Sequence, residues 1–157
     1  QWMVQLTQSL ELSNGLTLKS LSGFADTRQK ADIPLDGSLL PLLSFGSRGT
    51  SSRQYSQDIQ LLSDGQERLS WILGASYFQS DDKYDPLYNR LPFASQLLGL
   101  FSEQIFVVEQ QTKALAGFAE GTYRVSDDLM VTGGVRYTDE QRKILDSNYT
   151  AFSGIPN

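Results

Sequence analysis

Alternation of apolar and polar residues is the feature that most constrains this chain. From Val4 to Ser13, a run of ten residues, apolar and polar side chains take opposite sides, and Gln8 is the one misfit. A period of two predicts a β-strand, because successive side chains of a strand point to opposite faces. We predict five further strands, at Leu16–Ala25, Tyr55–Ser63, Leu69–Tyr77, Thr112–Val125 and Leu129–Thr138. In the second strand the alternation slips at Ser20-Leu21, which predicts a β-bulge.

The connections between these strands alternate in length. Tight turns are expected at Asn14-Gly15, Asp64-Gly65 and Asp127-Asp128. Long loops are expected at 26–54 and 80–111, and a third long segment begins after Thr138. Strands of about ten residues, with short turns at one rim and long loops at the other, are typical of outer-membrane barrels. The predicted fold class is therefore all-β, an antiparallel up-and-down transmembrane β-barrel segment. Alternation alone leaves a soluble antiparallel sheet open as well.

Aromatic residues gather near both ends of the predicted strands. Trp71 and Tyr123 lie toward the tight turns, and the long-loop ends carry Phe24, Tyr55, Tyr77 and Tyr137. Rings with an apolar body and a polar tip prefer the two headgroup levels of a membrane. We therefore expect two aromatic girdles, with the apolar rows between them facing lipid.

Six strands are too few to close a barrel, for which eight is the usual minimum. Closure is required because every backbone polar group within hydrocarbon must be bonded inside the protein. The polar rows, with Glu11, Asp58, Glu120 and Arg136, are expected to face the lumen. The chain opens abruptly and without a signal peptide, so we expect residues 1–157 to be one partial barrel domain, a fragment whose neighbours complete the wall.

The composition excludes several classes of function. The chain has no Cys and no His, which removes thiol catalysis, His-based triads and almost every zinc site. Its net charge of −5 comes without the basic patch of a nucleic-acid binder. Asp81, Asp82 and Asp85 lack the Gly and distal Glu of a calcium loop, so a solvated loop is expected there. Asp139-Glu140 and Glu103 have no partner that would separate an acid from a base. We predict no enzyme, no catalytic or metal-binding residue and no cofactor, and we assign no ligand-binding residue.

Four stretches resemble recurrent segments of TonB-dependent receptors. Tyr55–Leu61 followed by Trp71–Phe78 resembles a hairpin common in that family. Ala116–Asp127 and Val131–Glu140 are similar to the strands that come next, the last through its Thr-Gly-Gly-Val-Arg-Tyr-Thr run. The likeness covers chiefly residues 53–79 and 112–142. The chain departs from the family in having Asp58 and Gln60 where Glu and Arg are frequent, and no TonB box, plug or terminal strand is recognised.

The resemblance implies a barrel of about 22 strands around a plug, in the bacterial outer membrane. Such a receptor imports a scarce solute, most often an iron–siderophore complex. The partners implied are outer-membrane lipid, the remainder of the barrel and the plug, the TonB complex acting through that plug, and a ferric siderophore or other small solute, with no nucleic acid. Two alternatives are a TonB-independent barrel of the porin or autotransporter type, and a soluble β-sandwich that acts as a binding module.

Two local features have more than one interpretation. Arg136 is suited to attracting an anionic ferric complex or pairing with a carboxylate of the plug. It is also suited to pairing with Glu120 on the neighbouring strand, and we favour this structural role. The apolar segment 94–108 fits an outward extension of the wall, a short helix that caps the lumen, or a ligand-contact surface. Weaker candidates for ligand contact from outside are the aromatic residues Tyr84, Tyr88 and Phe93.

Overall fold

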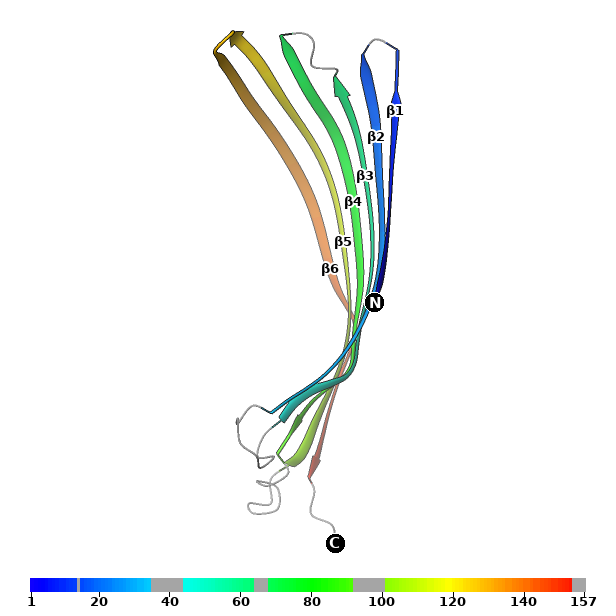
Figure 1. Ribbon diagram of the computed structural model, residues 1–157. Coiled ribbons are helices and arrows are strands. Elements are labelled where there is room, and N and C mark those ends of the chain that lie inside the picture. Colours follow the sequence, from blue (N-terminus) through cyan, green and yellow to red (C-terminus); the bar gives the residue numbers. More distant parts are fainter. Residues whose placement is uncertain (14, 35–43, 64–67, 92–100, 154–157) are drawn as a thin grey trace.

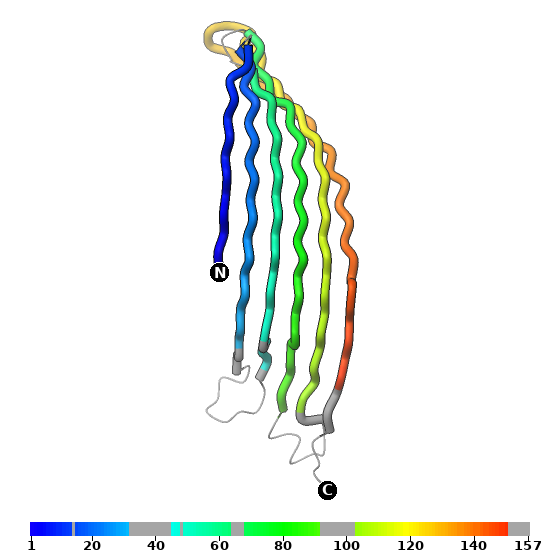
Figure 2. The backbone as a smooth tube through the Cα atoms, turned by 90° about the vertical axis from the view of Figure 1, so that its right-hand side faces the viewer, coloured from blue at the N-terminus to red at the C-terminus, as the bar shows by residue number. Residues whose placement is uncertain are grey.

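The described residues form one antiparallel sheet of six strands (Figures 1 and 2). The computed structural model describes residues 1–13, 15–34, 44–63, 68–91 and 101–153. Its strands are β1 (Trp2–Glu11), β2 (Leu16–Pro34), β3 (Ser44–Ser63), β4 (Leu69–Arg90), β5 (Phe101–Ser126) and β6 (Leu129–Ser153). Each strand pairs with the next along the chain, so β1 and β6 lie at the two edges and the sheet is not closed. The predicted fold class, a segment of an incomplete up-and-down barrel, is confirmed.

Two of the predicted tight turns lie at the same end of the sheet, at the top of Figure 1. Gly15 has a φ of 70°, a left-handed conformation that glycine adopts without steric cost. Beside it the backbone N–H of Leu12 donates to the carbonyl oxygen of Leu16 at 2.7 Å. Asp127 and Asp128 form the turn between β5 and β6. Asn14 and the third predicted turn, Asp64-Gly65, lie outside the described residues.

The strands are longer than the alternation predicted, up to 26 residues in β5. Much of the expected loops at 26–54 and 80–111 belongs to the strands, and β6 replaces the long segment expected after Thr138. The loop boundaries were therefore wrong. The reason is that alternation reports the surroundings of the side chains and not the pairing of the backbone. A strand with water on both faces keeps its ladder without an apolar row.

The length of β5 also decides between the interpretations of part of the apolar segment 94–108. Residues 101–108 belong to β5, which makes them an extension of the wall and not a capping helix. The remaining residues of that segment, and Phe93, lie outside the part of the chain that the structure describes.

The β-bulge predicted at Ser20-Leu21 is wrong. The β1–β2 register runs without a shift from Trp2 to Glu11, and in β2–β3 the irregularity lies between Gln29 and Ala31. The alternation slips for a chemical reason. The hydroxyls of Ser20 and Ser22 lie on the same face as Leu18 and Phe24 of β2, where both hydrogen-bond to Gln57 of β3.

A single sheet has no interior, and in the described part only Tyr88 and Ala116 are buried apolar residues. Packing therefore occurs between side chains on one face, across neighbouring strands. The tightest case joins Gly74 of β4 to Phe118, its direct partner on β5. The Phe118 ring occupies the space above Gly74 so closely that a Cβ added to this glycine would overlap the ring. The guanidinium of Arg136 lies 5.5 Å from the ring centroid of Phe118.

We expect Gly74→Ala to lower the free energy of unfolding of the intact receptor by about 1–3 kcal/mol, because the new methyl group displaces the Phe118 ring. Gly117→Ala is the matched control. A Cβ at Gly117 meets no atom within 4 Å, so the change should stay within about 0.5 kcal/mol. Denaturant titration in detergent measures both. In a Phe118→Ala background the cost of Gly74→Ala should disappear, and equal costs for the two glycines would contradict the packing.

Candidate functional site: the two faces of the wall

The register sorts the side chains of the sheet into two faces, because cross-strand partners point the same way. The apolar face carries mostly aliphatic and aromatic residues: Val4, Leu6, Leu10, Leu18, Phe24, Tyr55, Ile59, Leu61, Leu69, Trp71, Leu73, Tyr77, Leu115, Tyr123, Val131, Val135 and Tyr137. The opposite, polar face carries mainly Ser, Thr, Gln and charged residues. This confirms the predicted alternation. Leu115, Val135 and Tyr137 are 60%, 70% and 76% exposed, so no other part of the described chain covers them.

The apolar face forms a band of constant width. It spans Leu16–Phe24 in β2, Leu69–Tyr77 in β4 and Leu129–Tyr137 in β6, which is nine residues in each strand. Nine to eleven residues are about what a tilted strand needs to cross a bilayer. Trp71 and Tyr123 lie on this face near the tight-turn end, as predicted for the second girdle. The band therefore has the height of a membrane core.

The edge of the band that lies farther from the tight turns is a slanted line of mostly aromatic residues, called the aromatic line below. The ladder aligns Trp2 of β1 with Asp81 of β4, and Tyr137 of β6 with Ala75 of β4. Over the five steps from β1 to β6, the line thus moves by six residues (81 − 75) toward the tight turns. With about 3.3 Å per residue and about 4.8 Å between strands, this slope corresponds to a strand tilt of about 40°. Transmembrane barrels have tilts of about 35–45°, so one flat interface meets all six strands.

The polar face holds the four charged residues expected there, Glu11, Asp58, Glu120 and Arg136. The expected pairing of Arg136 with Glu120 is wrong, since no ion pair between described residues joins them. The direct partner of Arg136 across the ladder is Phe118. Its Nη2 donates to the hydroxyl oxygen of Ser76 at 3.1 Å and its Nε to that of Thr138 at 3.3 Å.

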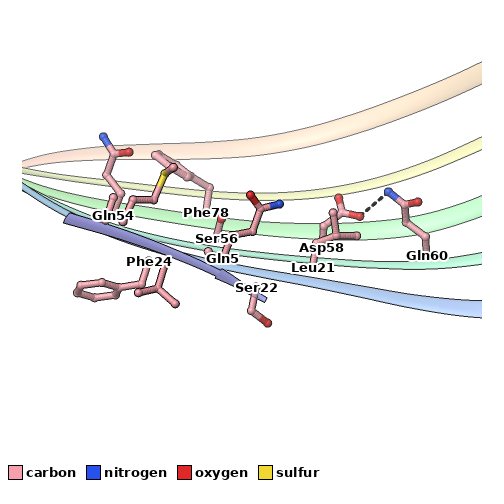
Figure 3. Close-up of a pocket in the computed structure, with 13 residues that line it drawn as sticks. Gln5, Leu21, Ser22, Phe24, Gln54, Ser56, Asp58, Gln60 and Phe78 are labelled. Atoms are coloured by element: carbon pink, nitrogen blue, oxygen red, sulfur yellow. Dashed lines mark hydrogen bonds between the residues drawn. The ribbon is translucent and has the colours of Figure 1, made fainter. Parts of the chain in front are cut away.

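A depression of about 440 Å³ lies along β1 to β4 and is mainly lined from the polar face (Figure 3). Gly23 opens it, because this residue has no side chain opposite Ser56. Its lining combines amide and carboxylate groups, such as Gln5 and Asp58, with the apolar side chains of Leu21 and Phe78. The Gln60 amide donates to the Asp58 carboxylate at 2.6 Å. These groups can hydrogen-bond to whatever fills the lumen, and none is arranged as a nucleophile with a base.

A polar cluster that sequence reasoning missed interrupts the apolar face. Gln57 accepts a hydrogen bond from the Ser22 hydroxyl at 2.6 Å, and its amide donates to Ser20 at 2.9 Å. The Tyr55 hydroxyl also approaches the Gln57 carbonyl, at 3.4 Å. The signal was present as two breaks in alternation, one in each of two adjacent strands. Partners within the cluster lower the cost of placing an amide and two hydroxyls in apolar surroundings.

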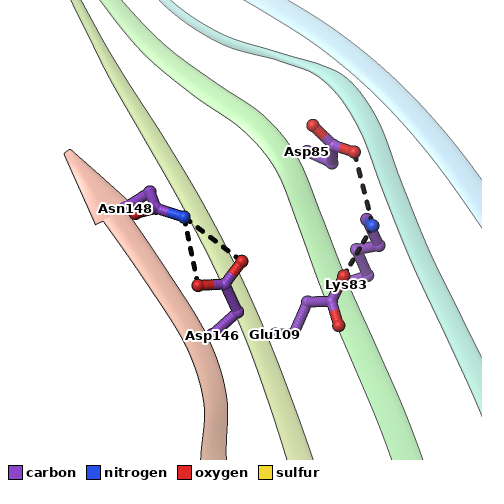
Figure 4. A network of polar contacts seen from close by, with 5 residues as sticks. All are labelled: Lys83, Asp85, Glu109, Asp146 and Asn148. Atoms are coloured by element: carbon purple, nitrogen blue, oxygen red, sulfur yellow. Dashed lines mark hydrogen bonds and ion pairs between the residues drawn. The ribbon is translucent and has the colours of Figure 1, made fainter. Parts of the chain in front are cut away.

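Charged residues begin where the apolar band ends. Lys83 bridges the carboxylates of Glu109 at 2.5 Å and Asp85 at 3.5 Å (Figure 4). Hydrogen bonds from Gln111 and Gln79 lower the pKa of Asp81 below its ordinary value. The contact with Glu109 raises the pKa of Lys83. This part of the sheet therefore has the properties of a wet surface.

The carboxylates considered as calcium ligands do not converge. Asp81 and Asp82 are adjacent in β4 and so point to opposite faces, and Asp82 accepts from Ser80 at 3.0 Å. Among the described residues no group of three or more His, Cys, Asp and Glu could hold a metal ion.

The other candidate carboxylates and aromatic rings have separate surroundings. Glu103 pairs with Arg90 at 2.9 Å and Glu140 with Arg142 at 2.7 Å. Tyr88 is buried, with the Arg90 guanidinium 4.3 Å from its ring centroid, while Tyr84 is 36% exposed. Whether Tyr84 touches a ligand stays a prediction.

Comparison with known families identifies the wall. A family model described as TonB dependent receptor-like, beta-barrel, matches residues 1–154. The chain belongs to the TonB-dependent receptor family. It therefore forms part of the barrel of an outer-membrane transport receptor, in a family of receptors and transporters and not of enzymes. A search of curated proteins finds no match. No helix among the described residues has the length and hydropathy of a membrane-spanning helix.

We expect Leu73→Arg to destabilise the receptor by about 2–4 kcal/mol, since Leu73 lies at the centre of the β4 band and an arginine there must enter hydrocarbon. Ile72→Arg is the matched control. Ile72 is the neighbouring residue, also apolar, but it points to the polar face opposite Glu120. Folding titrations into lipid vesicles measure both variants. Equal penalties would show that the two faces are assigned wrongly.

Proposed function

We propose that this chain is a wall of a receptor that imports an iron–siderophore complex across the bacterial outer membrane. The observation that carries the membrane assignment is the apolar band, nine residues wide and slanted at the tilt of a transmembrane barrel. The partners of the wall are then outer-membrane lipid on the apolar face, and the plug and the passing solute on the polar face. The TonB complex acts through the plug.

Two features support an iron chelate as the solute. Members of this family most often import such chelates, as the resemblance of the four sequence stretches implies. The polar face also presents Arg136, whose guanidinium contacts two neutral hydroxyls and an aromatic ring and forms no ion pair with a carboxylate of the described residues. An uncompensated guanidinium attracts an anionic chelate.

We expect cells that express the intact receptor to take up radiolabelled iron from at least one class of siderophore, and to lose this uptake when TonB is deleted. The panel includes hydroxamate, catecholate and carboxylate chelates, with cobalamin as the competing solute. A receptor-deleted strain is the control. Uptake of cobalamin but of no iron chelate would contradict the proposal of a siderophore as the solute, while it would agree with a role in transport. Uptake of a solute without TonB would instead indicate a porin-type barrel.

We expect the strand ends beyond the aromatic line to be outside the cell. The chain has no Cys, so single cysteines can be introduced without background from this region. Lys30→Cys, at the exposed outer end of β2, should react with a membrane-impermeant maleimide on whole cells. Ser13→Cys, in the exposed tight turn at the opposite end, should react only after the cells are opened. The reverse result would invert the orientation.

A further inference from the structure

Two arginines stand just past the aromatic line on the outward side of the sheet. Arg53 lies two residues beyond Tyr55, and Arg28 lies four residues beyond Phe24. The register places both on the side that carries the apolar band, with no shift between them and the line. If the band spans hydrocarbon, these side chains are at the level of the lipid headgroups.

The two arginines share one carboxylate. Asp26 is 14% exposed and lies 3.5 Å from Nε of Arg28 and 3.4 Å from Nε of Arg53. The side chains of Arg28 and Arg53 remain 73% and 66% exposed. One negative charge thus orients two positive charges. Asp81, the direct partner of Arg53 on β4, lies beside them and accepts hydrogen bonds from Gln79 and Gln111.

The neighbouring cation, Lys83, differs from the two arginines in its partners. Lys83 faces Arg28 across Ser51, but the carboxylates of Glu109 and Asp85 already hold it (Figure 4). A groove of about 290 Å³ is lined by Arg28, Arg53 and Lys83 together with Asp81 and Glu109. Glu109 pairs with Lys83 at one end of the groove, and Asp81 lies opposite Arg53. The two arginines therefore differ from Lys83 in the exposure of their side chains and not in an excess of charge.

We propose that Arg28 and Arg53, oriented by Asp26, bind the phosphate of an outer-leaflet lipid headgroup beside the receptor wall. This inference rests on the membrane assignment made above. A guanidinium presents a planar fork that matches two phosphate oxygens, and two forks on adjacent strands can share one phosphate. A lipid is the fitting source, because the acyl chains below such a headgroup lie along the apolar band.

The test compares lipids retained by the intact receptor. Detergent-solubilised receptor is titrated with phosphatidic acid, which carries a phosphate monoester, and with phosphatidylcholine, and bound lipid is counted by native mass spectrometry. We expect selective retention of phosphatidic acid that weakens as salt is added. Arg28→Gln and Arg53→Gln should each weaken it by about fivefold. Arg53→Lys should restore only part of it, because lysine keeps the charge and loses the fork.

Arg142→Gln is the matched control, because it removes the same charge from a side chain of similar exposure, 68%, on the polar face. It should leave phosphatidic acid retention unchanged. An equal loss in this control, or equal retention of the two lipids by the unmodified receptor, would overturn the phosphate site. A folded receptor that inserts into vesicles and fails this test rejects only the lipid proposal. A receptor that does not insert rejects the membrane assignment and, with it, this inference.

Discussion

The structure depends on backbone hydrogen bonds made between strands. Within hydrocarbon an unpaired N–H or C=O costs several kcal/mol, so a strand can cross only where both of its edges are bonded. Strands β2 to β5 meet this condition inside the described sheet, whereas β1 and β6 each keep one free edge. The band on the apolar face can therefore face lipid only if further strands complete these edges. This requirement agrees with a family whose members are barrels.

Because the ladder satisfies the backbone, each face of the sheet is free to suit its own surroundings. The slanted line from Trp2 to Tyr137 shows that the edge of the apolar band lies at one height relative to the membrane, although the strands cross that height obliquely. The cluster around Gln57 is the exception on the apolar face. Its amide group hydrogen-bonds to the two serine hydroxyls. These polar side chains therefore find partners within the protein, as the backbone groups do.

Sequence reasoning succeeded where water and lipid lie on opposite sides of a strand. The facing of Glu120 and Arg136, the turn at Asp127-Asp128 and the family were all predicted, because each leaves a local pattern. The strand ends beyond Phe24 and Tyr77 were missed, since side chains wet on both faces carry no period. The Gly74–Phe118 contact and the surroundings of Arg136 were missed for another reason. They depend on which residues the register brings opposite each other, and a single strand does not contain that information.

The extension of the ladder beyond the band also explains how charged groups are held at a defined height. On a flexible loop, bringing Arg28 and Arg53 to one carboxylate would cost conformational entropy. On adjacent strands the backbone is already fixed, and Asp26 stands directly opposite Arg53 in the register. The same pairing that lets the wall cross a membrane therefore positions two guanidinium groups just beyond the aromatic line. A rigid strand end is a better platform for an oriented phosphate contact than the long loop that the alternation alone predicted.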